Sequence, residues 1–270
     1  MVAAHELEKA REGLHVSYSQ VRTYTICPAK FEHNYVVRTE PSHRPVALVL
    51  GGAVHHALAH FYMNVKTTGE KIAESDFLDM FREKIDAELD ASVPIRFDDG
   101  EDEGAMIDQG VGLLKMFHQK ADCPTVLAVE QPFNVDIFDP ASGEILDLKL
   151  TGVMDLLVQG ENQPRVIEHK TASKRYASWQ LEFETQPTVY KYAARQIGMG
   201  EVDLCYQLLI KTKVPSLQLC PIDRTESHER EMMETFTGVL KAIESGIFFR
   251  NRSWACQDCQ FRYKCDEAKG

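Results

Sequence analysis

The sequence predicts an α/β fold, and three features of the chain support that prediction. The 270 residues are 44% hydrophobic and 26% charged, which is the composition of an ordinary globular protein. Apolar residues recur at helical spacing before residue 124, whereas the region after it carries short strand-like runs separated by Gly, Pro and Asn turns. At this length we expect one large domain or two small ones, with a core that needs no disulfide bonds.

The charge balance limits the function classes. The net charge of −11 excludes a basic protein that coats nucleic acid, but it does not exclude an enzyme that grips nucleic acid in a local groove. The N-terminus, Met1–Glu8, is polar and helix-like and has no apolar signal core. The most apolar stretch, Val46–Met63, contains two glycines and three histidines and is too polar to span a bilayer. We therefore expect a cytoplasmic protein with no membrane contact.

Helices dominate the first part of the chain and strands the middle. Residues 17–36 have a helical pattern that Cys27-Pro28 interrupts, since proline favours a turn or a new helix start. The segments 74–91 and 103–120 flank an acidic turn, and we expect them to form a helical insert. Short strands joined by turns predict an antiparallel meander. The predicted helices are 51–66, 74–91, 103–120, 180–197 and a final amphipathic helix that ends at Gly246. The predicted strands are 125–137, 145–158, 165–170, 202–210 and 217–221.

Two predicted strands carry the residues with chemical potential. Asp155 interrupts an apolar strand, and Glu168 and Lys170 lie two apart on the next strand, so their side chains share one face. Burying these three groups together is costly unless something pairs them, and a divalent cation between Asp155 and Glu168 would relieve the carboxylate repulsion. Such a site suits phosphodiester hydrolysis, with Lys170 holding the attacking water or offsetting transition-state charge. A buried structural ion pair is the alternative.

Helical side chains could complete this site. His55 lies on the edge of the apolar stripe of helix 51–66, where it could add a nitrogen ligand, whereas His56 points to the solvent side. Gln186 and Tyr190 are four residues apart on a predicted helix and therefore share a face. They could position a substrate phosphate and Lys170, or they could simply pack.

The order of these motifs resembles the PD-(D/E)xK nuclease superfamily, in particular its RecB-type iron–sulfur exonuclease branch. The motifs are Gly51-Gly52-Ala53-Val54-His55, Gly152-Val153-Met154-Asp155, Glu168-His169-Lys170 and Gln186-Pro187-Thr188-Val189-Tyr190. The resemblance implies a restriction-endonuclease-like core, a mixed sheet flanked by helices. It also implies that Mg²⁺ or Mn²⁺ is bound by His55, Asp155, Glu168 and the backbone carbonyl of His169. Glu130 could add an outer carboxylate or could lie on the surface.

Seven cysteines, an odd number, argue against a disulfide framework. Cys256, Cys259 and Cys265 form a C-x2-C-x5-C pattern, and a closed tetrahedral metal site would need a fourth soft ligand. The resemblance assigns Cys27 to that role and implies a [4Fe–4S] cluster, with zinc as the alternative metal. The cluster would act as a structural clamp between distant parts of the chain. The three other cysteines are predicted to pack in the core: Cys123, Cys205 and Cys220.

Together these features predict a metal-dependent DNA nuclease, an exonuclease on single-stranded ends. The alternatives are a non-catalytic DNA-binding subunit and a zinc-clamped interaction protein, and the sequence does not indicate whether the protein has protein partners. Basic and aromatic residues that could grip DNA are Lys174, Arg175, Lys211, Lys213, Arg250, Arg252, Arg262, Lys264, Tyr176, Trp179, Phe248, Phe249, Trp254, Phe261 and Tyr263. They could instead be ordinary surface cations and a small aromatic core under the cysteine cluster. The predicted organisation is an N-terminal cysteine segment 1–50, a helical region 51–123 with the histidine motif, a nuclease core 124–224 and a C-terminal helix with the cysteine cluster 225–270.

Overall fold

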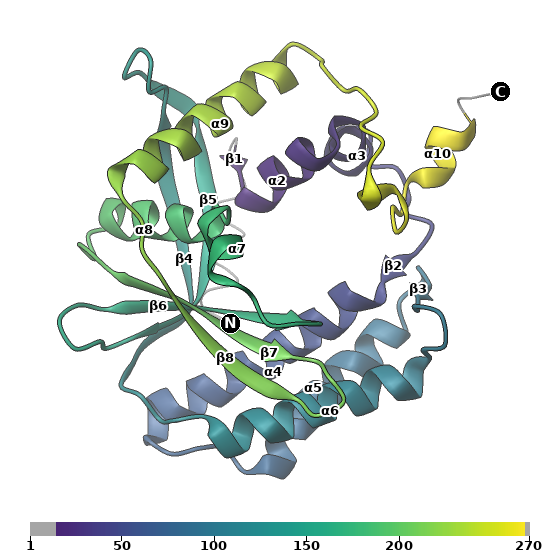
Figure 1. The fold of residues 1–270 in the computed structure, drawn as a ribbon, viewed down its shortest axis with the longest axis vertical. Helices are drawn as coiled ribbons and strands as arrows, with labels where there is room; N and C mark the ends of the chain where they lie inside the picture. The colour runs from purple at the N-terminus through teal and green to yellow at the C-terminus, as the bar shows by residue number, and fades with distance from the viewer. Residues whose placement is uncertain (1–14, 268–270) are drawn as a thin grey trace.

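The sheet lies between two layers of helices in the computed structural model, which describes residues 15–267 (Figure 1). Within this range the main sheet has six strands. They are β1 (His15–Val16), β4 (Val126–Phe138), β5 (Ile145–Val158), β6 (Arg165–Ala172), β7 (Asp203–Ile210) and β8 (Ser216–Ile222). The short strands β2 (Arg44–Pro45) and β3 (Ile95–Arg96) pair separately. The polar N-terminus Met1–Glu8 lies outside the described residues.

The strand order makes the sheet mixed. The strands follow one another as β1-β5-β6-β7-β8, and β4 pairs with β5. Strands β4, β5 and β6 pair antiparallel, which confirms the predicted meander, and β6 pairs parallel with β7. A parallel neighbour requires a crossover connection, and here it consists of α7 (Ser178–Glu182) and α8 (Gln186–Gln196). The predicted α/β class is therefore confirmed.

The two helical layers bury separate apolar clusters. One face of the sheet is covered by α2 (Tyr18–Ile26), α8 and α9 (Glu226–Glu244). The other is covered by α4 (Val46–Thr68), α5 (Glu74–Leu89) and α6 (Glu103–Lys120). The pair α5 and α6, predicted as an insert, packs on α4 and forms part of this layer (Figure 1). Gly110 makes the packing possible, because a Cβ atom there would lie 2.1 Å from Cζ of Phe81.

Helix α4 is long and apolar enough to cross a membrane by length and composition alone, so the prediction that Val46–Met63 is too polar to do so is wrong by that criterion. It begins at Val46, earlier than the predicted start at residue 51. Ala53, Ala57 and Phe61 have no exposed surface because they pack against α5, α6 and the sheet, whereas Leu48 is 69% exposed. Much of the hydrophobicity of α4 is therefore explained by its place in the core of the fold.

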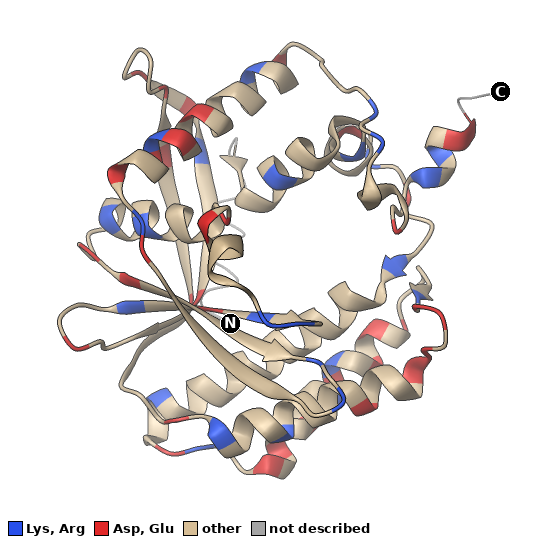
Figure 2. Ribbon diagram, in the orientation of Figure 1, with Lys and Arg blue, Asp and Glu red and all other residues tan. Residues whose placement is uncertain are grey.

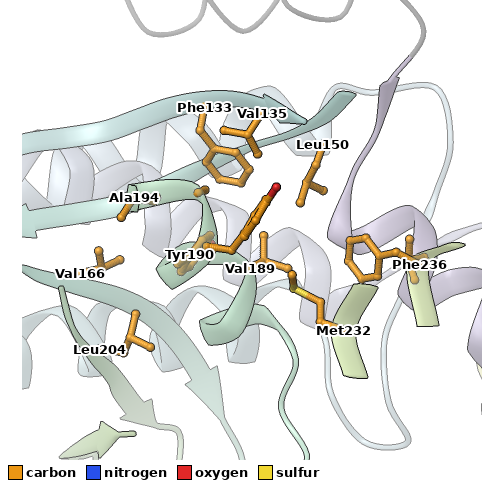
Figure 3. Close-up of a cluster of buried hydrophobic side chains, with 14 of the residues drawn as sticks. Phe133, Val135, Leu150, Val166, Val189, Tyr190, Ala194, Leu204, Met232 and Phe236 are labelled. Atoms are coloured by element: carbon orange, nitrogen blue, oxygen red, sulfur yellow. The ribbon is translucent and has the colours of Figure 1, made fainter. Parts of the chain in front are cut away.

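The cluster under α8 joins the sheet to the helix that carries Gln186 and Tyr190. Figure 3 shows Phe133 of β4 beside Tyr190, and the two rings meet edge to face with centroids 6.2 Å apart. Phe133 lies directly on Gly152 of β5, where a Cβ atom would come within 2.4 Å of the ring. Gly152, three residues before Asp155, therefore leaves space for the ring of Phe133. That ring in turn packs against Tyr190.

The predicted helix 180–197 is wrong as a single element. It is divided into α7 and α8 by the corner at 183–185. Arg224, which is buried, holds this corner: its Nη2 donates to the carbonyl oxygens of Leu181 (2.6 Å) and Glu184 (2.7 Å), and its Nε donates to Oγ1 of Thr188 (3.0 Å). The guanidinium thereby fixes the start of α8.

Replacing Arg224 by methionine should lower the free energy of unfolding by about 2–4 kcal/mol, because two half-buried carbonyls lose their donor. Urea unfolding measures the change. Arg230→Met on the exposed face of α9 is the matched control and should cost less than about 0.5 kcal/mol. Equal losses in the two variants would contradict the role given to Arg224.

The N-terminal and C-terminal segments lie side by side (Figure 1). The first contains α2, α3 (Pro28–Phe31) and a helical turn, Glu32–Val36, and the second contains Trp254–Cys256 and α10 (Arg262–Glu267). The Phe249 carbonyl accepts from the amide of Ala29 (3.1 Å), and the Ile26 carbonyl accepts from Nδ2 of Asn251 (2.9 Å). These bonds join the segment of Cys27 to the segment of the three C-terminal cysteines.

Candidate functional site

A fork in the sheet creates the candidate site. Strands β5 and β6 pair only where Leu156–Val158 meets Arg165–Ile167, and β1 joins β5 at Lys149–Leu150. Between these two ladders the edge of β5 is open, and Asp155 lies there. Its Oδ2 accepts from the backbone amide of His169 at 2.9 Å. A side chain therefore occupies the place where the β5–β6 ladder would otherwise continue.

Glu168, Lys170, Gln186 and Tyr190 form one hydrogen-bonded network on the α8 side of the fork. Oε1 of Glu168 accepts from Lys170 Nζ (3.1 Å) and Gln186 Nε2 (2.8 Å), and Oε2 accepts from the Tyr190 hydroxyl (2.7 Å). Oε1 of Gln186 accepts from Lys170 Nζ (2.7 Å), and its Nε2 also donates to Tyr190 (2.7 Å). Each side chain is thus oriented by at least two others.

The rings of His55 on α4 and His169 on β6 lie on the α4 side of the fork. Nδ1 of His55 lies 3.3 Å from Oδ2 of Asp155. The ring of His169 points away from Glu168, as alternation predicts, and stacks on Tyr62 of α4 with centroids 5.4 Å apart. The backbone of His169 thus lies at the fork while its side chain packs under α4. The structure brings His55, Asp155 and Glu168 into one electrostatic cluster with Lys170.

The two carboxylates have opposite pKa shifts. Burial alone would raise the pKa of Asp155, but His55, together with the charge and amide of His169, holds it down at about 2. Burial and the negative charge of Asp155 raise the pKa of Glu168 to about 7, against the opposing effects of Lys170 and Tyr190. The charges of half-buried Asp155 and buried Glu168 repel each other, and their oxygen atoms are donors of the kind that a hard divalent cation prefers. In residues 15–267, however, no three or more His, Cys, Asp and Glu side chains are arranged to hold a metal ion.

Divalent-cation affinity should depend on pH through Glu168. With its pKa raised to about 7, Glu168 is mostly protonated at pH 6 and mostly ionised at pH 8, and a cation must displace that proton. We expect Mn²⁺ to bind roughly tenfold more tightly at pH 8 than at pH 6. The metal-free fold should lose the stabilisation from protonated Glu168 as the pH rises through 7. Melting temperatures with and without Mn²⁺ measure both effects. The expectation would be contradicted if the stabilisation by Mn²⁺ did not change with pH and were equal in the parent and in Glu168→Gln.

Four cysteines line one cavity between the two terminal segments. The cavity has a volume of about 390 Å³, and Cys27, Cys256, Cys259 and Cys265 are all half-buried in its wall. Burial and the three neighbouring thiols raise the pKa of Cys265, against the charge of Arg250. An all-sulfur donor set fits iron or zinc in chemical type. Cations also line the cavity: Lys30, Arg250, Arg252 and Arg262.

The remaining candidate residues fall in different places. Cys205 and Cys220 are buried as predicted, but Cys123 is exposed, so its prediction as a core residue is wrong. It lies in the loop between α6 and β4, where no element covers it. Glu130 is exposed with a positive φ of 50°, and its charge acts on His56, so it lies apart from the network at the fork.

Basic and aromatic side chains lie around the open end of the fork. Figure 2 shows basic residues after β6 and on the β7–β8 hairpin, and the amide of Lys211 donates to the carbonyl of Ala172 (2.8 Å), which ties these two places together. Trp179 of α7 is 62% exposed and Phe183, just after it, 76%. Of the predicted grip residues, Phe261 is buried, and Phe248 packs against the core.

Three residues of the site carried no sequence signal. The ring of Tyr206 on β7 lies beneath the ammonium of Lys170, and Glu184 accepts from the Tyr206 hydroxyl. Arg224 holds the corner before Gln186. In sequence, Tyr206 looks like one more apolar residue of a buried strand, and the other two look like ordinary loop charges.

Comparison with known proteins gives one family match. Residues 15–266 match the sequence model described as PD-(D/E)XK nuclease superfamily. No curated protein matches the chain.

Solved structures resemble the fold at low sequence identity. A chain from Eubacterium rectale described as a candidate exonuclease superposes with a TM-score of 0.55 at 13% identity, covering 91% of this chain and 87% of its own. The protein SSO0001 aligns over 92% of this chain and 94% of its own at 13% identity, with a TM-score of 0.36. The first likeness supports the α/β fold with a mixed sheet flanked by helices.

Proposed function

The chain belongs to the PD-(D/E)XK nuclease superfamily, and from that premise we propose that it is a metal-dependent exonuclease acting on single-stranded DNA ends. Nucleases of this superfamily typically use a divalent metal and act on nucleic acid. The observation that carries the proposal is the pair of carboxylates, half-buried Asp155 and buried Glu168, at the fork beside the Lys170 ammonium.

Each residue of the fork has a proposed role. Asp155, Glu168, His55 and the backbone carbonyl of His169 would hold Mg²⁺ or Mn²⁺. When bound, the cation would polarise the scissile phosphate and lower the pKa of a coordinated water. Lys170 Nζ would orient the attacking water and offset charge on the phosphate. Gln186 and Tyr190 orient the side chains of Glu168 and Lys170 through their hydrogen bonds.

The substrate preference is proposed from the surface beside the fork. Four exposed or half-exposed cations, Lys174, Arg175, Lys211 and Lys213, form no ion pair within residues 15–267 and could contact a phosphate backbone. The exposed rings of Trp179 and Phe183 offer faces on which unpaired bases can stack. Paired bases cannot present their faces in this way, so the surface favours single strands.

A [4Fe–4S] cluster is proposed at Cys27, Cys256, Cys259 and Cys265. Four thiolates give such a cluster a net negative charge, and the four cations that line the same cavity would offset it. The cluster would join the two terminal segments already linked through Ala29 and Asn251. Its proposed role is structural, and zinc is the alternative occupant.

An assay on labelled DNA tests the proposed function. The anaerobically purified protein would be given linear single-stranded DNA labelled at the 5′ or 3′ end, the matching duplex, and circular single-stranded DNA, with Mn²⁺, Mg²⁺ or EDTA. We expect metal-dependent shortening of the linear single strand from an end, slower cutting of duplex and an intact circle. Cutting of the circle would replace the exonuclease assignment with an endonuclease. DNA retention without any cutting would favour a non-catalytic binding subunit.

A further inference from the structure

The ring of Tyr206 forms the floor beneath Lys170. Lys170 Nζ lies 4.8 Å from the ring centroid, within cation–π range. Tyr206 is only 1% exposed and lies in register with Glu168 on the neighbouring parallel strand, so both side chains rise from the same face of the sheet. The long side chain of Lys170 reaches over this ring to meet Glu168.

The ring differs in kind from the other two contacts of the ammonium. Glu168 Oε1 and Gln186 Oε1 each accept one N–H of Lys170, at 3.1 and 2.7 Å. The aromatic face attracts the positive charge but neither neutralises it nor needs a particular N–H. Among residues 15–267 these are the two acceptors that bind the ammonium, so the ring adds an attraction that a hydrogen bond does not supply.

Tyr206 is itself held in place. Its hydroxyl donates to Oε2 of Glu184 at 3.4 Å, and the backbone carbonyl of Glu184 accepts from Arg224 at 2.7 Å. Burial raises the pKa of the Tyr206 hydroxyl far above its usual value, with a further contribution from Glu184, so the phenol remains neutral. The floor beneath Lys170 is therefore uncharged, and the ring is anchored at its hydroxyl.

We propose that Tyr206 is a positioning residue that holds the Lys170 ammonium over the scissile phosphate through its aromatic face. The inference rests on the proposed function and deepens it. It assigns to Tyr206 an effect on the chemical step rather than on DNA or metal binding.

Graded fluorination of the ring tests the proposal. Tyr206→Phe keeps the aromatic face but loses the hydrogen bond to Glu184, so it serves as the reference for the series. Mono-, di- and trifluorinated phenylalanine at position 206 keep nearly the same shape but weaken the face, so kcat should fall stepwise, by about 2- to 30-fold in total. KM for DNA and the Mn²⁺ dependence should not change. Constant kcat along the series would overturn the proposal, because mere packing depends on shape.

A second readout does not depend on cleavage. The Cε protons of Lys170 should resonate upfield in the parent through the ring current, with the signal assigned by Lys170→Arg, and Tyr206→Leu should remove the shift. A parent that cleaves but shows no such shift, or shows no change along the fluorinated series, overturns this inference alone. A parent that cleaves no DNA with either metal overturns the proposed function, and the inference with it.

Discussion

Asp155→Asn is expected to lower the rate of Mn²⁺-dependent DNA cleavage by roughly a thousandfold or more, because the variant would lose a proposed charged metal ligand. Asparagine has the same shape, and its Oδ1 can still accept from the amide of His169, which Asp155 Oδ2 now does at 2.9 Å. What the variant loses is the negative charge that raises the pKa of His55 and that we propose helps to hold the cation. Single-turnover cleavage of a labelled single strand measures the loss.

The matched control, Asp147→Asn, tests whether the loss of cleavage is specific to a charge at the fork. Asp147 lies on the same strand, β5, but is exposed. Asp147→Asn removes an equal charge and should leave cleavage within about twofold, since exposed charges at a distance are screened. Both variants should melt within a few degrees of the parent. Asp155→Asn with parental activity would reject the assignment of Asp155.

Cys259→Ser is expected to produce the largest loss of stability. If the four cysteines hold a cluster, its bonds close a loop that spans most of the chain, from Cys27 to Cys256. A covalent link across so long a loop contributes roughly 5 kcal/mol by restricting the unfolded chain. We expect a lower melting temperature, loss of iron and poor solubility, measured by calorimetry and metal analysis of anaerobically purified protein.

Cys123→Ser is the control for the loss of a thiol. Cys123 is exposed and lies outside the cavity, so this variant should match the parent in iron content and stability. A brown parent with about four irons per chain would support the cluster, and a colourless parent with zinc would support the alternative metal. A Cys259→Ser protein as stable and as fully metallated as the parent would contradict the clamp.

Local patterns predicted much of the fold. The helix 103–120 and the strand 145–158 have the predicted bounds, because each has a strong period and a clear turn at its end. Alternation along one strand also placed Glu168 and Lys170 on one face, where they now share Gln186 as a partner. Such features depend on neighbours in sequence, so the sequence alone can specify them.

Features that depend on distant contacts could not be predicted. The corner between α7 and α8 is stabilised by hydrogen bonds from Arg224, which lies in a loop about forty residues later in the sequence. The parallel pairing of β6 with β7 brings Tyr206 beside Glu168, and no local pattern distinguishes this tyrosine from a packing residue. Cys123 precedes a proline, but the loop that carries it lies on the surface. The roles assigned to the fork residues remain predictions for experiment.

Anomalous scattering from Mn²⁺-soaked crystals near pH 8 tests the central claim most directly. The account predicts a peak at the fork between the carboxylates of Asp155 and Glu168, within about 2.5 Å of an oxygen of each. The peak should disappear in crystals of Asp155→Asn. A fork without manganese in the parent, with the ion bound elsewhere on the chain, would contradict the assignment of this site to metal-dependent hydrolysis.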